Sequence, residues 1–210
     1  MADNQIIENL PGVIEELEKN CTENPGSVIA HHHLALVYRK ANRIDDAIRE
    51  LTKALELDPY SFESLINLGS IYFEKNELDK SLAINEQAVR INENSAQAHA
   101  NIGLIWQRKN DPDKAIAAYT KATQHNPKLA TAWVNLASAY IEAGNIDEAL
   151  KAAKEGVALE PDFGMAQNNL AVAYYFAKDC KSAKIHADKA TVLGYAVDPR
   201  FIAAINEALR

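Results

Sequence analysis

Apolar side chains recur along this chain at the spacing of a helix face. Within residues 130–163 they stand at Trp133, Leu136, Ala137 and Tyr140, which is a spacing of i, i+3, i+4 and i+7. Residues at these intervals share one face of an α-helix. A glycine then interrupts the pattern, and a second helical run follows it. The stretch therefore predicts two helices joined by a tight turn.

The same pattern returns when the chain is shifted by 34 residues in either direction. The shift divides the chain into five full repeats, a leading half-repeat and a closing helix, which together form one continuous domain. The predicted segments are 1–27, 28–61, 62–95, 96–129, 130–163, 164–197 and 198–210. The period predicts an all-α fold of about twelve helices and no sheet.

Small residues and helix breaks also keep the period. The small residues predict close crossings of two helices; they are Ala35, Gly69, Gly103, Ala137 and Ala171. Residues that tolerate a left-handed backbone would end each first helix; they are Asn42, Asn76, Asn110 and Gly144. Aspartates three residues later are suited to cap each second helix; they are Asp45, Asp79, Asp113 and Asp147. The fifth repeat has Lys178 and Lys181 at these two positions, so its turn is expected to be the least well specified.

The sequence predicts a helix at each end of the chain that covers the adjoining repeat. Near the start, an amphipathic helix is expected from about Pro11 to Asn20, after the apolar residues Ile6 and Ile7. At the other end, Asp198 can be the N-cap and Pro199 the first helical residue. An apolar stripe follows them at Phe201, Ile202, Ile205 and Leu209. Terminal repeats of a solenoid need such covers for solubility.

The pattern Trp133-x-x-Leu136-Ala137-x-x-Tyr140, with Ala149 and Pro161, closely resembles the tetratricopeptide repeat (TPR). The resemblance extends over the five repeats. It implies antiparallel helix pairs stacked into a right-handed superhelix, whose first helices line a concave surface. It also implies that the chain binds proteins or peptides.

The resemblance places one row of polar side chains on the concave surface. The row is His33, Asn67, Asn101, Asn135 and Asn169. An asparagine amide offers both a donor and an acceptor, so a row of them can bind the backbone of an extended peptide. A similar asparagine ladder occurs in the repeats of the O-linked N-acetylglucosamine transferase. The alternative is structural, because asparagine is the commonest residue at this position across the family.

The other concave positions are largely apolar, and exposed apolar patches often mark interaction sites. They are Ile29, Leu36, Ile66, Phe73, Leu104, Val134, Ile141, Met165, Val172, Tyr175 and Phe176. Phe73, Ile141, Tyr175 and Phe176 are the strongest candidates for binding. The alternative is that some of these side chains pack under neighbouring helices. Some family members clamp the acidic C-terminal tails of chaperones with basic and amide groups at fixed groove positions. This chain has apolar or uncharged residues at such positions, so an acidic tail is not the expected ligand; they are Ile66, Gln97, Ala100 and Thr131.

Charge and chemistry narrow the function further. The net charge of −7 argues against a nucleic-acid binder, and no apolar run is long enough to cross a membrane. Cys21 and Cys180 are expected to be reduced thiols. His31, His32 and His33 point about 100° apart on a helix, so these three side chains cannot converge on one metal ion. No catalytic, cofactor or metal motif is present.

The sequence therefore predicts a non-catalytic, cytoplasmic adaptor that holds an extended or helical segment of a partner protein, with no cofactor and no metal. The alternative is a homo-oligomeric scaffold, in which the concave surface of one copy takes a terminal helix of another. Residues 1–20 or 199–210 would be the inserted segment.

Overall fold

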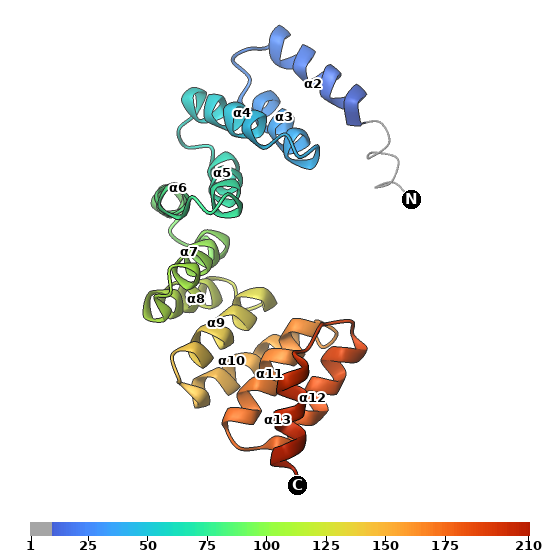
Figure 1. Cartoon of the computed structure of the whole chain (residues 1–210). Helices are drawn as coiled ribbons and strands as arrows, with labels where there is room; N and C mark the ends of the chain where they lie inside the picture. The colour runs from blue at the N-terminus through green and yellow to red at the C-terminus, as the bar shows by residue number, and fades with distance from the viewer. Residues whose placement is uncertain (1–9) are drawn as a thin grey trace. The chain divides into compact units, whose positions relative to one another are not determined.

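The structure is a computed structural model that describes residues 10–210. Within them it contains twelve α-helices and no β-strand, which confirms the all-α prediction (Figure 1; helix labels as drawn there). The chain forms two compact units, of which the first ends at Glu93 and the second begins at Asn94. The predicted apolar pair Ile6 and Ile7, and the first part of the N-terminal segment, lie outside the described residues.

The helices of each unit pack against their neighbours in chain order. The unit before residue 94 contains α2 (Leu10–Glu23), α3 (Val28–Lys40), α4 (Ile44–Leu57), α5 (Phe62–Glu74) and α6 (Leu78–Ile91). The unit from residue 94 contains α7 (Ala96–Arg108), α8 (Pro112–His125), α9 (Ala130–Glu142), α10 (Ile146–Leu159), α11 (Gly164–Phe176), α12 (Cys180–Val192) and α13 (Pro199–Ala208). The helices α3, α5, α7, α9 and α11 begin at intervals of 34 residues, and so do their partners α4, α6, α8, α10 and α12.

Each turn inside a helix pair contains one residue with a left-handed backbone, as predicted. The φ angles are 59° at Asn42, 59° at Asn76, 57° at Asn110 and 78° at Gly144. After Asn42, the N–H of Arg43 returns to the carbonyl of Tyr38 at 2.8 Å and so closes the preceding helix. This is the hydrogen bond of a Schellman C-cap.

The prediction that the periodic aspartates cap the second helices is wrong. The N-cap positions are Arg43, Glu77, Asp111 and Asn145, and each periodic aspartate (Asp45, Asp79, Asp113, Asp147) lies two residues further on, inside the first turn. A single residue separates each left-handed residue from the start of the helix, so the N-cap stands two residues before the predicted aspartate. Inside the first turn, these carboxylates oppose the positive end of the helix dipole.

The turn of the fifth repeat, which the sequence predicts to be the least well specified of the five, takes the same backbone conformation as the others. Lys178 takes the left-handed conformation, with φ of 66°. The next residue, Asp179, then caps α12, since its carboxylate accepts from the Ser182 N–H at 3.1 Å and from the Ser182 hydroxyl at 2.7 Å. A side-chain cap of this kind offsets the strain of a lysine in a glycine-like position.

The small residues allow close crossings within helix pairs, as expected. A Cβ added to Gly103 on α7 would lie 2.5 Å from the ring of Tyr119 on α8. One added to Gly69 on α5 would lie 2.4 Å from the amide of Asn85 on α6. In the first repeat Ala35 stands at the position of the glycines and Leu51 at that of Tyr119, and both are fully buried. In the third repeat the larger partner Tyr119 therefore accompanies a glycine, and in the second repeat the polar partner Asn85 does.

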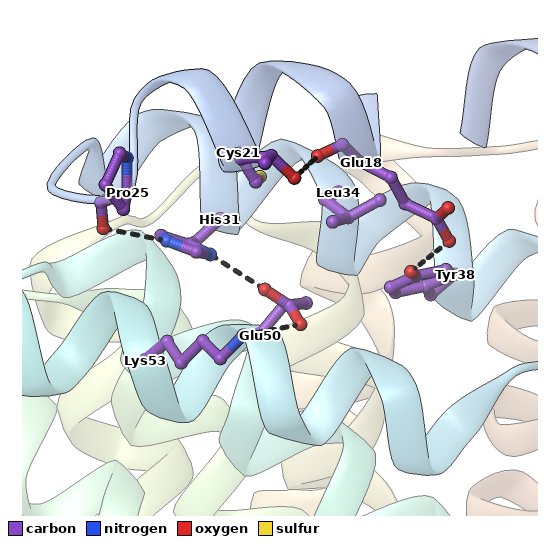
Figure 2. A pocket seen from close by; sticks show the side chains of 9 residues that line it. Glu18, Cys21, Pro25, His31, Leu34, Tyr38, Glu50 and Lys53 are labelled. Atoms are coloured by element: carbon purple, nitrogen blue, oxygen red, sulfur yellow. Dashed lines mark hydrogen bonds and ion pairs between the residues drawn. The ribbon is translucent and has the colours of Figure 1, made fainter. Parts of the chain in front are cut away.

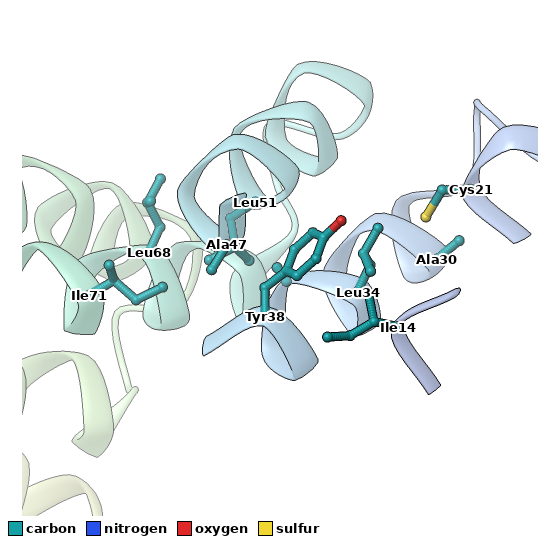
Figure 3. Packing of buried hydrophobic residues seen from close by; sticks show 10 residues of the cluster. Ile14, Cys21, Ala30, Leu34, Tyr38, Ala47, Leu51, Leu68 and Ile71 are labelled. Carbon is teal, nitrogen blue, oxygen red and sulfur yellow. The ribbon is translucent and has the colours of Figure 1, made fainter. Parts of the chain in front are cut away.

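The cores at the two ends of the chain include the terminal helices. Ile14 and Cys21 of α2 join a cluster with Leu34 and Tyr38 of α3 (Figure 3). In the other unit, Asp198 caps α13 by accepting from the Arg200 N–H at 2.8 Å, and Pro199 is the first helical residue, both as predicted. Ile205 of α13 is fully buried against small residues of α11 and α12, namely Ala171, Ala183 and Ala187.

Candidate functional site

The predicted binding residues of the unit from residue 94 lie on its first helices. Helix α9 packs against both α7 and α11. Across the first contact, the side-chain amide of Gln107 donates to the Glu142 carboxylate at 2.8 Å. Across the second, the side-chain amide of Asn169 donates to the main-chain carbonyl of Val134 at 3.1 Å. Polar side chains along this face therefore already hold the three helices in register.

The side chains of the predicted asparagine row differ in how many of their donors and acceptors are already used by other residues of the protein. Asn101 is buried, with 9% of its surface exposed, and it accepts from Gln97 at 2.9 Å. Asn135 is half-buried and makes no hydrogen bond with any described residue. The Nδ2 atom of Asn169 is bonded to Val134, as above. Asn135 is thus the member of this unit whose amide is most available to a ligand.

His33 and Asn67 belong to the other unit. His33 is exposed, whereas Asn67 is half-buried and donates to the Glu63 carbonyl at 2.9 Å. Its Nδ2 also lies 3.0 Å from Nε2 of His32. Burial, helped by the neighbouring His33, lowers the pKa of His32, so its neutral ring can accept this hydrogen bond. Asn67 therefore links α5 to α3.

The predicted apolar positions divide between exposed and packed side chains. Phe176 is 49% exposed, while Phe73, Ile141 and Tyr175 are half-buried. The ring of Tyr175 meets that of Phe201 edge-on, with centroids 5.5 Å apart, so α13 covers part of it. Val134 was expected in the groove, and this was wrong: it is fully buried, because Gly156 lets α10 approach it closely.

A second site, which sequence reasoning missed, lies between α2, α3 and α4. A pocket of about 400 Å³ is lined by residues of these helices (Figure 2). Cys21 of α2, His31 of α3 and Glu50 of α4 are buried in its wall, with 8%, 5% and 3% of their surfaces exposed. The sulfur of Cys21, a ring nitrogen of His31 and a carboxylate oxygen of Glu50 all lie within 4.8 Å of one another.

Both ring nitrogens of His31 have partners in this pocket. Nδ1 lies 2.7 Å from Oε2 of Glu50, and Nε2 lies 3.1 Å from the carbonyl oxygen of Pro25. A carbonyl only accepts, so Nε2 carries a proton. Burial alone would raise the pKa of Glu50, but hydrogen bonds from His31, Arg49 and Lys53 outweigh it and hold that pKa below its ordinary value. Nδ1 and Oε2 are within hydrogen-bond distance of each other, so one proton lies between them.

The periodic frame contained a signal for this site. The residues equivalent to His31 in the later repeats are Leu65, His99, Trp133 and Gln167, and those equivalent to Glu50 are Ile84, Ala118, Ala152 and His186. The departure from the repeat is therefore Glu50, since no other repeat has an acidic residue at its position. Cys21 carries no such signal, because it precedes the first full repeat. Burial, and secondly the nearby Glu50, raise the pKa of its thiol.

The fifth repeat has an uncharged version of the same network. There the Gln167 amide donates to the carbonyl of Pro161 at 2.7 Å, and its Oε1 lies 2.7 Å from Nδ1 of His186. In the fourth repeat, the indole N–H of Trp133 likewise donates to the carbonyl of Pro127 at 2.9 Å. A bond to the preceding proline carbonyl is therefore shared by the first, fourth and fifth repeats, and the partner carboxylate of Glu50 is particular to the first.

A family model described as "Tetratricopeptide repeat" matches residues 38–102 and 108–168, which together make up more than half of the chain. The chain belongs to the tetratricopeptide-repeat family. No curated protein matches it at a significant level. Within residues 10–210, no helix is both long enough and apolar enough to cross a membrane.

Solved structures of other TPR proteins share this fold. A crystal structure of MamA matches this chain with 23% sequence identity and a TM-score of 0.69. The match covers 82% of this chain and 98% of the MamA chain. YrrB, described as a TPR protein with an unusual peptide-binding site, matches with 21% sequence identity and a TM-score of 0.72. The match covers 92% of this chain and 99% of the YrrB chain. The hetero-tetramer Cut9–Hcn1 of APC/C matches with 18% identity and a TM-score of 0.78, over 97% of this chain and 40% of the other.

Proposed function

We propose that this TPR protein is a non-catalytic adaptor that holds an extended segment of a partner protein along α7, α9 and α11. The observation that carries the proposal is the side chain of Asn135. It is half-buried, and its amide is unused by the described residues, while its equivalents Asn101 and Asn169 each make an internal hydrogen bond. Ile141 at the end of α9 and Phe176 at the end of α11 supply apolar surface for side chains of the segment.

The spacing of the repeats suits a peptide backbone. Neighbouring first helices pack about 8–10 Å apart, and an extended peptide rises about 3.3 Å per residue. Each repeat therefore matches about three peptide residues. One asparagine amide per repeat can then bond the backbone at regular intervals without selecting side chains, and the apolar positions between them provide the selectivity.

The test selects ligands from a phage-displayed library of random peptides on the immobilised full chain, and then measures their affinities by fluorescence anisotropy. Asn135→Ala should weaken binding about two- to tenfold, because one hydrogen bond contributes about 0.5–1.5 kcal/mol. Phe176→Ala should weaken it as well. Asn145→Ala is the matched control, since Asn145 is exposed and its side chain makes no capping bond.

Two results would count against the proposal. One is that no peptide is enriched. The other is that the enriched peptides bind the wild type, Asn135→Ala and Phe176→Ala equally well, which would place them elsewhere on the chain. If Asn135→Ala binds normally while Phe176→Ala abolishes binding, the ligand would be a helix held by its apolar face instead of an extended strand.

A homo-oligomeric scaffold is a second candidate function, and one observation favours it. Ile185 and Val192 of α12 stand seven residues apart, on one helix face, and are 66% and 85% exposed. A second copy that covered this face would remove both from water. Sedimentation velocity over a range of concentrations tests this: a rise in mass that Ile185→Glu abolishes would support it, and a constant monomer mass would exclude it.

A further inference from the structure

We propose that Cys21, His31 and Glu50 form a binding site for one divalent transition-metal ion, with zinc as the ion they suit best. The three side chains come from α2, α3 and α4, and their donor atoms lie within 4.8 Å of one another in the pocket wall (Figure 2). The site is separate from the row of asparagines and goes beyond the adaptor function.

The donor set has the chemistry of a zinc site. Zinc takes thiolate, imidazole and carboxylate ligands in tetrahedral geometry, at about 2.0–2.3 Å. Ligand atoms in such a tetrahedron lie about 3.3–3.6 Å apart. In the present structure Nδ1 and Oε2 are 2.7 Å apart, and no two of the three donor atoms are more than 4.8 Å apart. Shifts of about an ångström in these side chains would admit the ion.

The surroundings of His31 already have the arrangement of a metal ligand. Histidine ligands almost always donate their second ring N–H to a carboxylate or a backbone carbonyl, which fixes the tautomer and the ring orientation. The Nε2 of His31 donates in this way to the carbonyl of Pro25, at 3.1 Å. That leaves Nδ1, the nitrogen that faces Glu50, for the ion.

The charges also balance. The ion would take the place of the thiol proton of Cys21 and of the proton between Nδ1 of His31 and Oε2 of Glu50, and both protons would leave to solvent. A dication bound by one thiolate and one carboxylate is neutral overall, so burial of the cluster adds no net charge to the interior. The other oxygen of Glu50, Oε1, is held by Arg49 at 3.0 Å and Lys53 at 3.3 Å, so Oε2 remains for the ion.

The adjoining pocket provides the fourth ligand position. Three protein ligands with an open position for water are typical of zinc sites that stay accessible. The pocket is also lined by Glu18, Thr22 and Lys53. A bound ion would connect α2 directly to α3 and α4, so zinc would hold this terminal helix onto the first repeat.

The test uses the reduced, full-length chain without a histidine tag. Zinc is titrated by competition with a chromophoric chelator, and cobalt is used as a spectroscopic probe, because a cobalt–thiolate bond has a charge-transfer absorption that histidines alone do not produce. We expect one equivalent of zinc, a cobalt–thiolate band, and slower amide exchange in residues 10–23 when zinc is bound.

Three variants distinguish this site from other metal binding. Cys21→Ser should abolish the cobalt–thiolate band and weaken zinc affinity at least about 100-fold, because even loss of an outer-shell partner costs about 10–100-fold. Cys180→Ser, at the second free cysteine, should leave both unchanged. His33→Gln should also leave both unchanged, which separates the site from binding to the exposed part of the histidine run.

His31→Gln guards against a folding defect in the cysteine variant. The fifth repeat already has a glutamine at this position, Gln167, which bonds to its proline carbonyl. His31→Gln should therefore keep the fold and lose zinc. The proposal is overturned if the wild type shows no cobalt–thiolate band, if the band survives Cys21→Ser, or if His31→Gln binds zinc as tightly as the wild type.

Discussion

The contact between Gly103 and Tyr119 yields the sharpest stability prediction. Replacing glycine by alanine inside a helix normally stabilises it by up to about 1 kcal/mol. Here the new Cβ would lie 2.5 Å from the ring of Tyr119. The ring cannot yield easily, because it is fully buried and its hydroxyl donates to Gln107 at 2.6 Å. Overpacking costs about 1–3 kcal/mol, so Gly103→Ala should destabilise the protein by about 1–2 kcal/mol net.

The partner substitution should reverse the sign of this effect. Together with Gly103→Ala, Tyr119→Leu reproduces the pair that the first repeat uses, in which Ala35 stands opposite Leu51. In the Tyr119→Leu background, Gly103→Ala should no longer meet a ring and should stabilise the protein by about 0.5–1 kcal/mol. The double-mutant cycle should therefore give a coupling of about 2 kcal/mol.

Urea unfolding followed by tryptophan fluorescence is the appropriate assay. The chain has two tryptophans, Trp106 and Trp133, and both lie in the third and fourth repeats, beside the altered contact. Gly26→Ala is the control, because nothing lies within 4 Å of a Cβ there. If Gly103→Ala stabilises the wild type as much as it stabilises Tyr119→Leu, the close crossing does not exist as described.

Two further predictions concern the turns and the N-terminal pocket. Lys178→Gly should stabilise the protein by up to about 1 kcal/mol, because a left-handed backbone strains any residue with a Cβ; chemical denaturation measures this, and unchanged stability would contradict it. Burial and the hydrogen bond to Glu18 raise the pKa of Tyr38 to about 12. The neutral phenol is thus favoured by folding, so its contribution is complete below about pH 10 and is lost as pH rises towards 12. The free energy of unfolding should fall less steeply over this range in Tyr38→Phe, and parallel curves would contradict the prediction.

The periodic pattern predicted the all-α fold because each helix pair is specified locally. The left-handed turn residues and the small residues at the crossings depend on neighbours only 34 or fewer residues away, so spacing alone locates them. The capping positions were misjudged for an equally local reason. Asp45 and its equivalents stand inside the first turn, since only one residue separates the left-handed residue from the helix start.

The candidate sites were harder to predict, because they depend on which side chains the packing leaves open. The asparagine row was found from its period, but the sequence could not show that Asn169 bonds to a neighbouring helix while Asn135 does not. The sequence predicted Val134 as a groove residue, but the close approach of α10 at Gly156 buries its side chain. The Cys21–His31–Glu50 cluster was missed because Cys21 precedes the first full repeat and no other repeat has an acidic residue at the position of Glu50.

The matched sizes at the helix crossings restrict how this chain can be recombined. Gly103 and Tyr119 both belong to the third repeat, and Gly69 and Asn85 both belong to the second. A duplication or exchange that cuts between repeats carries each matched pair along intact. A cut inside a repeat would set Tyr119 against the alanine that another repeat supplies in place of Gly103. The unit that can be exchanged is therefore one repeat, counted from the start of its first helix to the end of its second. Chimeras with other repeat proteins should fold when their junctions lie in the loops before α5, α7, α9 and α11.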